Sequence, residues 1–335
     1  MSIKQGLESY SRILELTDLK RVKNSFESLS DDDREWLKRV HAKLGIRNTL
    51  FESMQKGVAV NQVFLNQIAQ SFNSTDMDGD IEARVRILPW VVAREWASEV
   101  GTEPERNTVN GHILDAIFNK ISNLADASIL VPGSACGRLV YEIACMGSKT
   151  VVGIDFDRLK TKTAQLILEG NKFTIRPYVL ETCNRESASD NVRQFNVPDV
   201  AIDKKILDHI QVVSSEFTDY SKSVPGGFFN GIATSFFLDT TRDIRIYLEQ
   251  FARLLPSGGY WINCGPLQYH YESEKFFNSG SPTERELNKE EVVELVKSYG
   301  FEITDEKLIE TEYLGNSKSL MSTRIKCLFF IARKL

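Results

Sequence analysis

The chain has 335 residues, 42% of them hydrophobic and 26% charged, which is the composition of an ordinary globular protein with room for two domains or for one domain with a large extension. A formal net charge of −5 excludes a general phosphate-backbone binder, which needs dense Lys and Arg, but it allows a small basic pocket. No apolar stretch approaches the length of a membrane span, so we expect neither a membrane nor a nucleic acid as partner.

The cysteines and histidines indicate the compartment and argue against a metal. Five scattered cysteines form no CxxC pair, which indicates reduced thiols in the cytoplasm, with the nucleus as a second compartment. No long apolar run follows basic residues at the N-terminus, so we expect no signal peptide. The four histidines lack the close spacing of a zinc site, and no metal is predicted.

Residues 1–125 are predicted to form an N-terminal helical cap region. Apolar side chains recur there at helical spacing, and alternating strand-like runs are absent. Ser30 precedes three aspartates, a pattern typical of a helix start. Two further helices are predicted near 87–100 and 110–124. We expect this region to bury one face of the domain that follows.

From residue 128 the pattern changes to strands alternating with helices, which is typical of a largely parallel sheet. The predicted strands lie near 128–132, 150–155, 211–214, 231–237, 259–264, 301–309 and 324–332. The predicted helices lie near 137–146, 158–169, 241–255 and 289–299. Residues 126–335 are therefore predicted to form one α/β domain.

An insertion at about 171–208 interrupts this domain. It has no clean periodicity and is far longer than a normal connection between a helix and a strand. We predict a lid or a partly ordered functional segment, and a disordered surface loop is the alternative that the sequence leaves open.

Residues 127–157 contain half of a nucleotide-binding unit. An apolar run meets a turn with Gly133 and Gly137, a helical pattern follows, and a second apolar run ends in Asp155. Such a turn lets backbone approach a ligand at a helix N-terminus, and the acid can accept hydrogen bonds from ribose hydroxyls. The turn lacks the third glycine of a dinucleotide fingerprint. The closing helix, strand, long turn and strand resemble the reversed last strand of class I methyltransferases. Both features favour S-adenosylmethionine over a nicotinamide.

Several blocks of the sequence resemble a specific family. The blocks VPGSACGRLVYEIA, GGFFNGIATSFFLDT and LLPSGGYWINCGPLQYHY are similar to signature blocks of the carnosine N-methyltransferases. Similar stretches are AREWASEVGTEPERN before the sheet, RPYVLETCNRESASDNVRQFNVPDV in the insertion and CLFFIARK at the C-terminus. The resemblance covers most of residues 80–335. It implies a Rossmann-like class I methyltransferase sheet, mostly parallel with an antiparallel last strand, behind an N-terminal helical extension.

The resemblance implies that this enzyme uses S-adenosylmethionine to methylate an imidazole nitrogen of a histidine-containing dipeptide or of a protein histidine. Backbone at Gly133 and Gly137 would approach the methionine and ribose portions of the cofactor, with a tight strand-to-helix turn as the alternative. Asp155 would bind the ribose hydroxyls where family members usually carry Glu. Its alternative is a strand-end acid in water.

Four further residues are implied for cofactor binding. Glu216 would accept from the adenine amino group and Phe217 would pack on the adenine face; a solvated acid beside a core Phe is the alternative. Ser235 would line the pocket through its backbone. The guanidinium of Arg94 would reach the cofactor carboxylate with bidentate geometry, and a surface salt bridge is the alternative.

The acceptor side needs a lone pair held in line with the methyl group and water excluded. Only an unprotonated imidazole nitrogen can attack, and a carboxylate that accepts N–H from the other nitrogen fixes that tautomer. Asp239 is predicted in this catalytic role, with an N-cap of the following helix as its alternative. His270 matches a family histidine that contacts the substrate, and Phe236 would pack on the substrate ring. A satisfied loop histidine and core packing are their alternatives.

One stretch departs from the family. Relatives carry consecutive tyrosines shortly before the last strand, where this chain has Ser322, Thr323, Arg324 and Ile325. The departure leaves the true acceptor open, though not methylation, and Arg324 is hypothesised to meet an acidic group of another substrate. A catalytically weak or inactive member that binds cofactor or a partner is the second interpretation, and a nicotinamide-dependent dehydrogenase the third. A homodimer is the one protein assembly that we consider.

Overall fold

The computed structural model describes residues 1–77, 79–98, 103–270 and 286–335, and it divides into two compact units. The helical unit comprises Met1–Glu103, Gly170–Ala201 and Gly315–Ser322. The sheet unit comprises Pro104–Glu169, Ile202–Leu314 and Thr323–Leu335. The division differs from the predicted boundary between residues 125 and 126, and it separates most of the insertion from the sheet.

The helical unit begins with six helices, three of which have a side-chain cap at their start. Ser2 and Thr49 each form a capping box, with Gln5 and Glu52 respectively, and these reciprocal bonds satisfy backbone groups that a helix start leaves free. Ser30 caps the helix that starts at Asp31, as the three aspartates after it predict. The helices are α1 (Ile3–Glu8), α2 (Tyr10–Leu16), α3 (Asp18–Glu27), α4 (Asp31–Leu44), α5 (Leu50–Ala69) and α6 (Ile81–Trp96).

The insertion is a folded part of the helical unit rather than a disordered loop. Strands β3 (Phe173–Ile175) and β4 (Phe195–Val197) pair antiparallel, with the short 3-10 helix η2 (Asp190–Val192) between them. The buried side chain of Asn61 on α5 accepts from the Arg176 amide (2.8 Å) and donates to the Arg176 carbonyl (3.0 Å). These bonds fix the insertion to α5. A role as a lid stays a prediction.

The sheet unit contains a seven-stranded sheet in the order β5-β2-β1-β6-β7-β9-β8. Strand β9 pairs antiparallel with both of its neighbours, and the other pairs are parallel. The strands are β1 (Ser128–Pro132), β2 (Thr150–Asp155), β5 (Ile210–Ser214), β6 (Gly231–Ser235), β7 (Tyr260–Gly265), β8 (Phe301–Tyr313) and β9 (Thr323–Lys334). The predicted class I methyltransferase sheet, with its last strand reversed, is confirmed.

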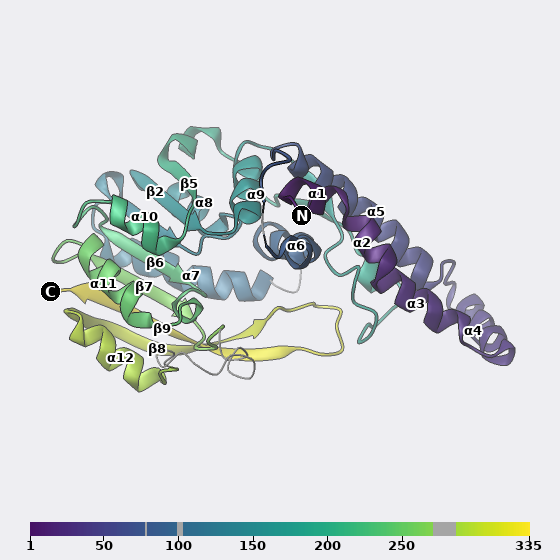
Figure 1. Cartoon of the computed structure of the whole chain (residues 1–335). Helices are drawn as coiled ribbons and strands as arrows, with labels where there is room; N and C mark the ends of the chain where they lie inside the picture. Colours follow the sequence, from purple (N-terminus) through teal and green to yellow (C-terminus); the bar gives the residue numbers. More distant parts are fainter. Residues whose placement is uncertain (78, 99–102, 271–285) are drawn as a thin grey trace, which may run out of the picture. The chain divides into compact units, whose positions relative to one another are not determined.

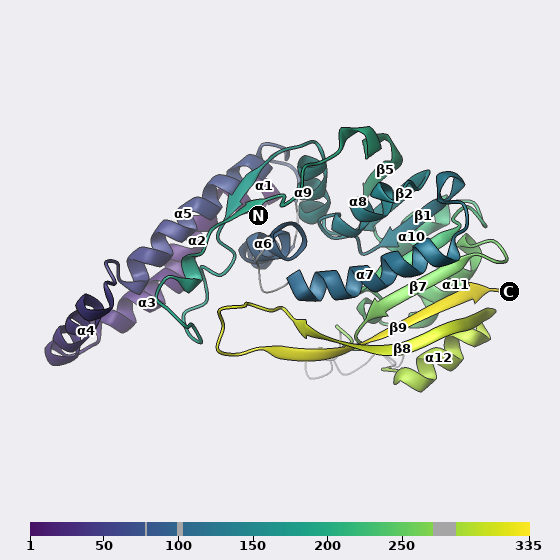
Figure 2. The same ribbon diagram turned by 180° about the vertical axis from the view of Figure 1, so that it is seen from behind.

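Helices cover both faces of this sheet, as Figures 1 and 2 show from opposite sides. The helices are α7 (Glu103–Lys120), α8 (Arg138–Cys145), α9 (Arg158–Leu168), α10 (Phe217–Ser223), α11 (Ile244–Leu254) and α12 (Lys289–Ser298); the 3-10 helices are η1 (Leu124–Asp126), η3 (Lys204–His209) and η4 (Leu238–Thr240). Apolar residues of α7 and α8 form one cluster with one face of the sheet. Apolar residues of α11 and α12 form a second cluster with the other face. In the described part of the chain, no helix is both long and apolar enough to cross a bilayer.

The β8–β9 hairpin continues past the end of β7 (Figure 2). Strand β7 pairs with β9 only as far as Gly265 opposite Leu328. The β8–β9 ladder goes on from Ile309 opposite Cys327 to Tyr313 opposite Thr323. We call this part, residues 309–313 and 323–327, the overhang. The predicted strand 301–309 includes only the first residue of the overhang on β8.

Candidate active site

The predicted site residues of the sheet unit lie at the carboxyl ends of its strands or in the segments that follow. Parallel strands bring these ends to one edge, which is where α/β folds bind ligands. The register places Asp155 opposite Ser214, and Ser235 opposite Cys264. Gly133 directly follows β1, and Asp239 lies in η4 after β6. The structure therefore brings the residues predicted to bind the methyl donor and the methyl acceptor, within this unit, to one edge of the sheet.

The turn after β1 has left-handed backbone at three positions. The φ angles are +70° at Gly133, +44° at Ala135 and +86° at Gly137, which is the N-cap of α8. A Cβ on Gly133 would lie 2.6 Å from a ring carbon of Phe237, so both backbone and packing require glycine there. The hydroxyl of Ser134 is buried and has no hydrogen-bond partner among the described residues. A left-handed turn with a buried, unpaired hydroxyl fits a nucleoside cofactor.

Asp155 holds this turn through its carboxylate. Oδ2 accepts from the Ala135 amide (3.0 Å) and Oδ1 accepts from the Asp157 amide (2.9 Å). Asp155 is 7% exposed, so it is not the solvated strand-end acid of the alternative interpretation. Burial raises the pKa of this carboxyl, against the lowering effects of Lys160 and of the two amides. A carboxylate has about four acceptor positions, so lone pairs remain for ribose hydroxyls.

Replacing Asp155 by Asn is expected to weaken S-adenosylhomocysteine binding about tenfold, because a neutral amide loses a charge-assisted bond and accepts with only one of its two atoms. Isothermal titration of the full chain measures this. Asp155→Glu, which keeps the charge with a longer reach, should bind better than Asp155→Asn. Equal affinities of both variants and the wild type would remove Asp155 from the cofactor site.

The pair predicted for adenine divides into an exposed acid and a buried ring. Glu216 is exposed and directly precedes α10. Phe217 is 4% exposed and packs edge-on to Phe237 and Tyr247, at 5.8 Å and 5.4 Å between ring centroids. Phe217 is thus a core residue, as its alternative interpretation had it. Contact of either residue with adenine stays a prediction.

Arg94 and Ser235 occupy different units. Ser235 is the last residue of β6 and is half-buried. Arg94 lies in the last turn of α6, in the helical unit, and is half-buried too. Its contact with the cofactor carboxylate stays a prediction.

Asp239 is buried and holds the segment after β7. Its Oδ2 accepts from the Gln268 amide (2.9 Å), and its carbonyl accepts from the His270 amide (3.1 Å). Asp239 is 2% exposed. Helix α11 begins at Ile244, and its N-cap is Asp243, whose carboxylate accepts from the Arg245 amide (3.0 Å). The N-cap alternative for Asp239 is therefore wrong.

Burial raises the pKa of the Asp239 carboxyl, and the Gln268 amide and the positive charge of His270 oppose that rise. The same segment is anchored again by Tyr269, whose hydroxyl donates to the Leu287 carbonyl (2.7 Å) and accepts from the Leu287 amide (3.1 Å). Burial raises the pKa of Tyr269 to about 12, so it stays a neutral hydroxyl. A costly buried carboxylate beside an anchored segment is typical of a functional site.

His270 is exposed and is the last described residue before 286. Its backbone is fixed by Asp239, and contact of its ring with a substrate stays a prediction. Phe236 has φ +50°, which is uncommon for a bulky side chain, and its amide donates to the Cys264 carbonyl (3.1 Å). This backbone ends β6 at Ser235, before the predicted end at 237.

Two residues beside Phe236 were not predicted. The ring of Tyr313 stacks on the ring of Phe236, with 5.9 Å between centroids and 19° between planes. A Cβ on Gly265 would lie 3.0 Å from the Phe236 amide nitrogen, so glycine permits the close approach of the two strand ends. Gly265 follows an apolar run, so the sequence could have indicated it as a strand-end residue. Tyr313 follows polar residues, so no pattern in the sequence indicated it.

The hypothesis for Arg324 finds no support in the overhang. Ile325 packs against the same apolar cluster as Phe236. Successive side chains of a strand point to opposite faces, so Arg324 lies on the other face of the hairpin. The face toward Phe236 carries Thr323, Ile325 and Tyr313.

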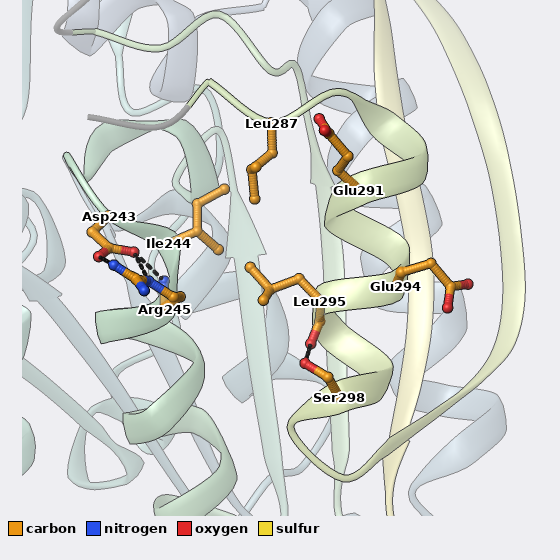
Figure 3. Close-up of a pocket in the computed structure, with 8 residues that line it drawn as sticks. All are labelled: Asp243, Ile244, Arg245, Leu287, Glu291, Glu294, Leu295 and Ser298. Atoms are coloured by element: carbon orange, nitrogen blue, oxygen red, sulfur yellow. Dashed lines mark hydrogen bonds and ion pairs between the residues drawn. The ribbon is translucent and has the colours of Figure 1, made fainter. Parts of the chain in front are cut away.

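A pocket of about 380 Å³ lies between α11 and α12 (Figure 3). Its lining residues are Asp243, Ile244, Arg245, Leu287, Glu291, Glu294, Leu295 and Ser298. The carboxylate of Asp243 is already engaged by Arg245. None of the predicted site residues lines this pocket. In the described ranges no group of His, Cys, Asp and Glu is arranged to hold a metal ion.

Comparison with known proteins gives consistent matches. The family described as carnosine N-methyltransferase matches residues 73–335. The carnosine N-methyltransferase of Schizosaccharomyces pombe is 31% identical, covering 88% of this chain and 82% of that protein. Carnosine N-methyltransferase unmet of Drosophila melanogaster is 29% identical, covering 81% of this chain and 59% of that protein. The carnosine N-methyltransferase of Mus musculus is 30% identical, covering 72% and 60%. The chain therefore spans less than two thirds of the fly and mouse proteins. A methyltransferase structure from Methanosarcina mazei covers 65% of this chain and 96% of that chain, at 18% identity and a TM-score of 0.43.

Proposed function

This chain belongs to the carnosine N-methyltransferase family, and we propose that it methylates a ring nitrogen of an imidazole, in a histidine-containing dipeptide such as carnosine or in a protein histidine. As a member of that family it is an S-adenosylmethionine-dependent N-methyltransferase. The observation that carries the proposed acceptor is the buried carboxylate of Asp239, which follows a strand end and caps no helix.

The bound cofactor supplies an electrophilic methyl group on a sulfonium. The turn after β1 and the last residue of β2 would hold it, with Asp155 on the ribose and the backbone of the left-handed turn beside the cofactor. Little acid–base chemistry is needed from the chain, so its task is to orient the acceptor and exclude water.

Asp239 would orient the imidazole. One carboxylate oxygen accepts from Gln268, and the carboxylate keeps acceptor capacity for the N–H of the ring. That bond places the unprotonated nitrogen toward the methyl group. The same carboxylate would stabilise the positive charge that the ring gains as the methyl arrives, an effect that is strong in a site from which water is excluded.

The second candidate is a member of the family that binds cofactor without turnover. The observation that favours it is the replacement of the expected tyrosines by Thr323, Arg324 and Ile325, which leaves the acceptor side with fewer rings. Binding without transfer would then be the activity of this chain.

Two measurements test these candidates: the first distinguishes both from a nicotinamide-dependent dehydrogenase, and the second distinguishes them from each other. Full-length protein that binds S-adenosylhomocysteine should unfold at a higher temperature with it, whereas NAD should have no effect, because a ligand specific for the native state stabilises that state. Transfer of label from S-adenosylmethionine is then measured with carnosine, free histidine and a protein lysate. Labelled carnosine or labelled protein histidine supports the proposed function. Cofactor binding with no labelled product from any acceptor contradicts it and favours the second candidate.

A further inference from the structure

The segment that Asp239 holds is fixed from two sides. The amides of Gln268 and His270 donate to the carboxylate and to the carbonyl of Asp239, at 2.9 Å and 3.1 Å. The side chain of Tyr269, the residue between them, reaches a different part of the chain. Its hydroxyl donates to the Leu287 carbonyl (2.7 Å) and accepts from the Leu287 amide (3.1 Å). One hydroxyl therefore binds both backbone polar groups of a residue 18 positions further along the chain.

The Leu287 end of this connection lies at a well-defined helix start. The next residue, Asn288, is the N-cap of α12 and forms a capping box with Glu291. Both Leu287 and the ring of Tyr269 pack against the apolar cluster that α11 and α12 form with the sheet. The hydroxyl of Tyr269 therefore ties the segment beside Asp239 to a capped helix.

Asp239 depends on the position of this segment because burial works against its charge. At 2% exposure, burial raises the pKa of its carboxyl, and the Gln268 amide and the positive charge of His270 oppose that rise. Both of these groups belong to the immediate neighbours of Tyr269. A segment that moved away would take the amide with it and leave the carboxylate free to turn.

From these contacts we propose that Tyr269 is a positioning residue for the methyl transfer: its two bonds to Leu287 hold residues 268–270 so that the carboxylate of Asp239 stays directed at the acceptor. This inference rests on the proposed function, in which Asp239 orients an imidazole. In this role Tyr269 acts through Asp239 and needs no contact with the cofactor or the acceptor. A displacement of about 1 Å at a reacting group can cost about 100-fold in rate, so a residue outside the site can control turnover.

The test compares Tyr269→Phe with the wild type in the full-length protein, with carnosine as acceptor. The variant keeps the ring that packs in the apolar cluster and loses both bonds to Leu287. Its kcat should fall about tenfold, because the carboxylate is directed at the acceptor for less of the time. The KM for carnosine should change by less than about threefold, because the orientation matters most as the methyl group is transferred. The affinity for S-adenosylhomocysteine should be unchanged.

The pH dependence of kcat is a readout that a purely structural role would not move. Asp239 must be charged to accept the N–H of the acceptor, and the Gln268 amide lowers the pKa of this carboxyl. A segment released from Leu287 should let that pKa rise, so the variant should lose kcat at a higher pH than the wild type does as the pH falls. In the described ranges, His270 and Tyr269 are the titratable groups whose charges interact with Asp239.

Hydrogen exchange provides a second readout, which needs no turnover. The amides of Gln268 and His270 are protected by their bonds to Asp239. In Tyr269→Phe both amides should exchange faster, because local opening of the segment becomes easier.

Tyr141→Phe is the matched control. Tyr141 is a buried tyrosine of α8 whose hydroxyl accepts from the Asp203 amide (3.2 Å), so this variant also removes a hydroxyl that binds backbone. It should unfold at a lower temperature than the wild type, with kcat and its pH dependence unchanged.

The outcomes are distinct. A wild type that methylates carnosine, together with an unchanged kcat and pH dependence in Tyr269→Phe, would overturn the role of Tyr269 and leave the proposed function standing. Unchanged exchange of the Gln268 and His270 amides would overturn it too. Equal falls of kcat and cofactor affinity would also do so, because they indicate a general loss of structure. A wild type that methylates no acceptor would overturn the proposed function, and the role of Tyr269 with it.

Discussion

Replacing Asp239 by Asn should reduce the turnover number about 100-fold or more while the affinity for S-adenosylhomocysteine stays nearly unchanged. An amide at this position can present its N–H₂ to the acceptor ring and so favour the wrong tautomer. The Gln268 amide can still donate to the Asn oxygen, so the local structure should persist. Initial rates at saturating acceptor and calorimetric titration of the cofactor product measure the two quantities.

The same variant should gain stability at neutral pH. Burial raises the pKa of Asp239, so the folded state binds its proton more tightly than the unfolded state does. The charge therefore costs stability as pH rises through the raised pKa, and the cost is complete above it. Asn carries no charge, so thermal unfolding should favour the variant at pH 7, and the difference should shrink as pH falls toward 3.8, the ordinary value for Asp.

Asp243→Ala is the matched control, four residues along the chain. Asp243 caps α11 and pairs with Arg245, so its loss should cost about 1 kcal/mol of stability with little change in turnover. Asp239→Asn should show the opposite pattern. A variant of Asp239 that loses stability, turnover and cofactor affinity together would mean that this carboxylate is structural.

Gly133→Ala should destabilise the protein by about 2–4 kcal/mol, because it combines a left-handed backbone with an overpacked contact. The φ of +70° disfavours any side chain, and the new Cβ would lie 2.6 Å from Phe237. That ring cannot move freely, since it stacks on Tyr247 with 4.6 Å between centroids and 9° between planes. Phe237 also follows Phe236, so both cofactor affinity and the KM for the acceptor should worsen.

Gly147→Ala separates the two costs. Gly147 has φ +91°, and a Cβ there would meet nothing within 4 Å. It should therefore lose only the backbone part, about 1 kcal/mol, with unchanged ligand binding. Denaturant unfolding of both variants, read with the titrations above, checks this. Equal losses of stability in Gly133→Ala and Gly147→Ala would show that the contact with Phe237 adds nothing to the cost of a side chain at Gly133.

The sheet could be predicted from the sequence because each strand is a local feature. Apolar runs bounded by glycine, proline and polar turns gave all seven strands, and the family resemblance gave the reversal of the last one. The bonds between Asn61 and Arg176 could not be predicted, since 115 residues separate them and periodicity carries no information on such pairs. The sequence therefore predicted a lid or a partly ordered segment, and not the insertion's hydrogen bonds to α5.

The site could be predicted in part. Asp155 and Asp239 were predicted from their places at strand ends, but their burial and amide partners were not. The start of α11 was predicted three residues too early, at 241, because the chain passes through η4 before the helix begins at Ile244. Tyr313 was missed because Glu310 and Glu312 hid the continuation of β8, and because a left-handed Phe236 has no sequence signature.

The interleaving of the two units has a consequence for how the protein is made. The helical unit is built from three separate segments, the last of which ends at Ser322. Within it, Tyr178 donates to the Gly315 carbonyl and Asn184 accepts from the Leu320 amide, so the earlier segments bond to the latest one. A growing chain commonly folds its N-terminal domain first. Here the helices that leave the ribosome first must wait for nearly the whole chain before their unit can be completed.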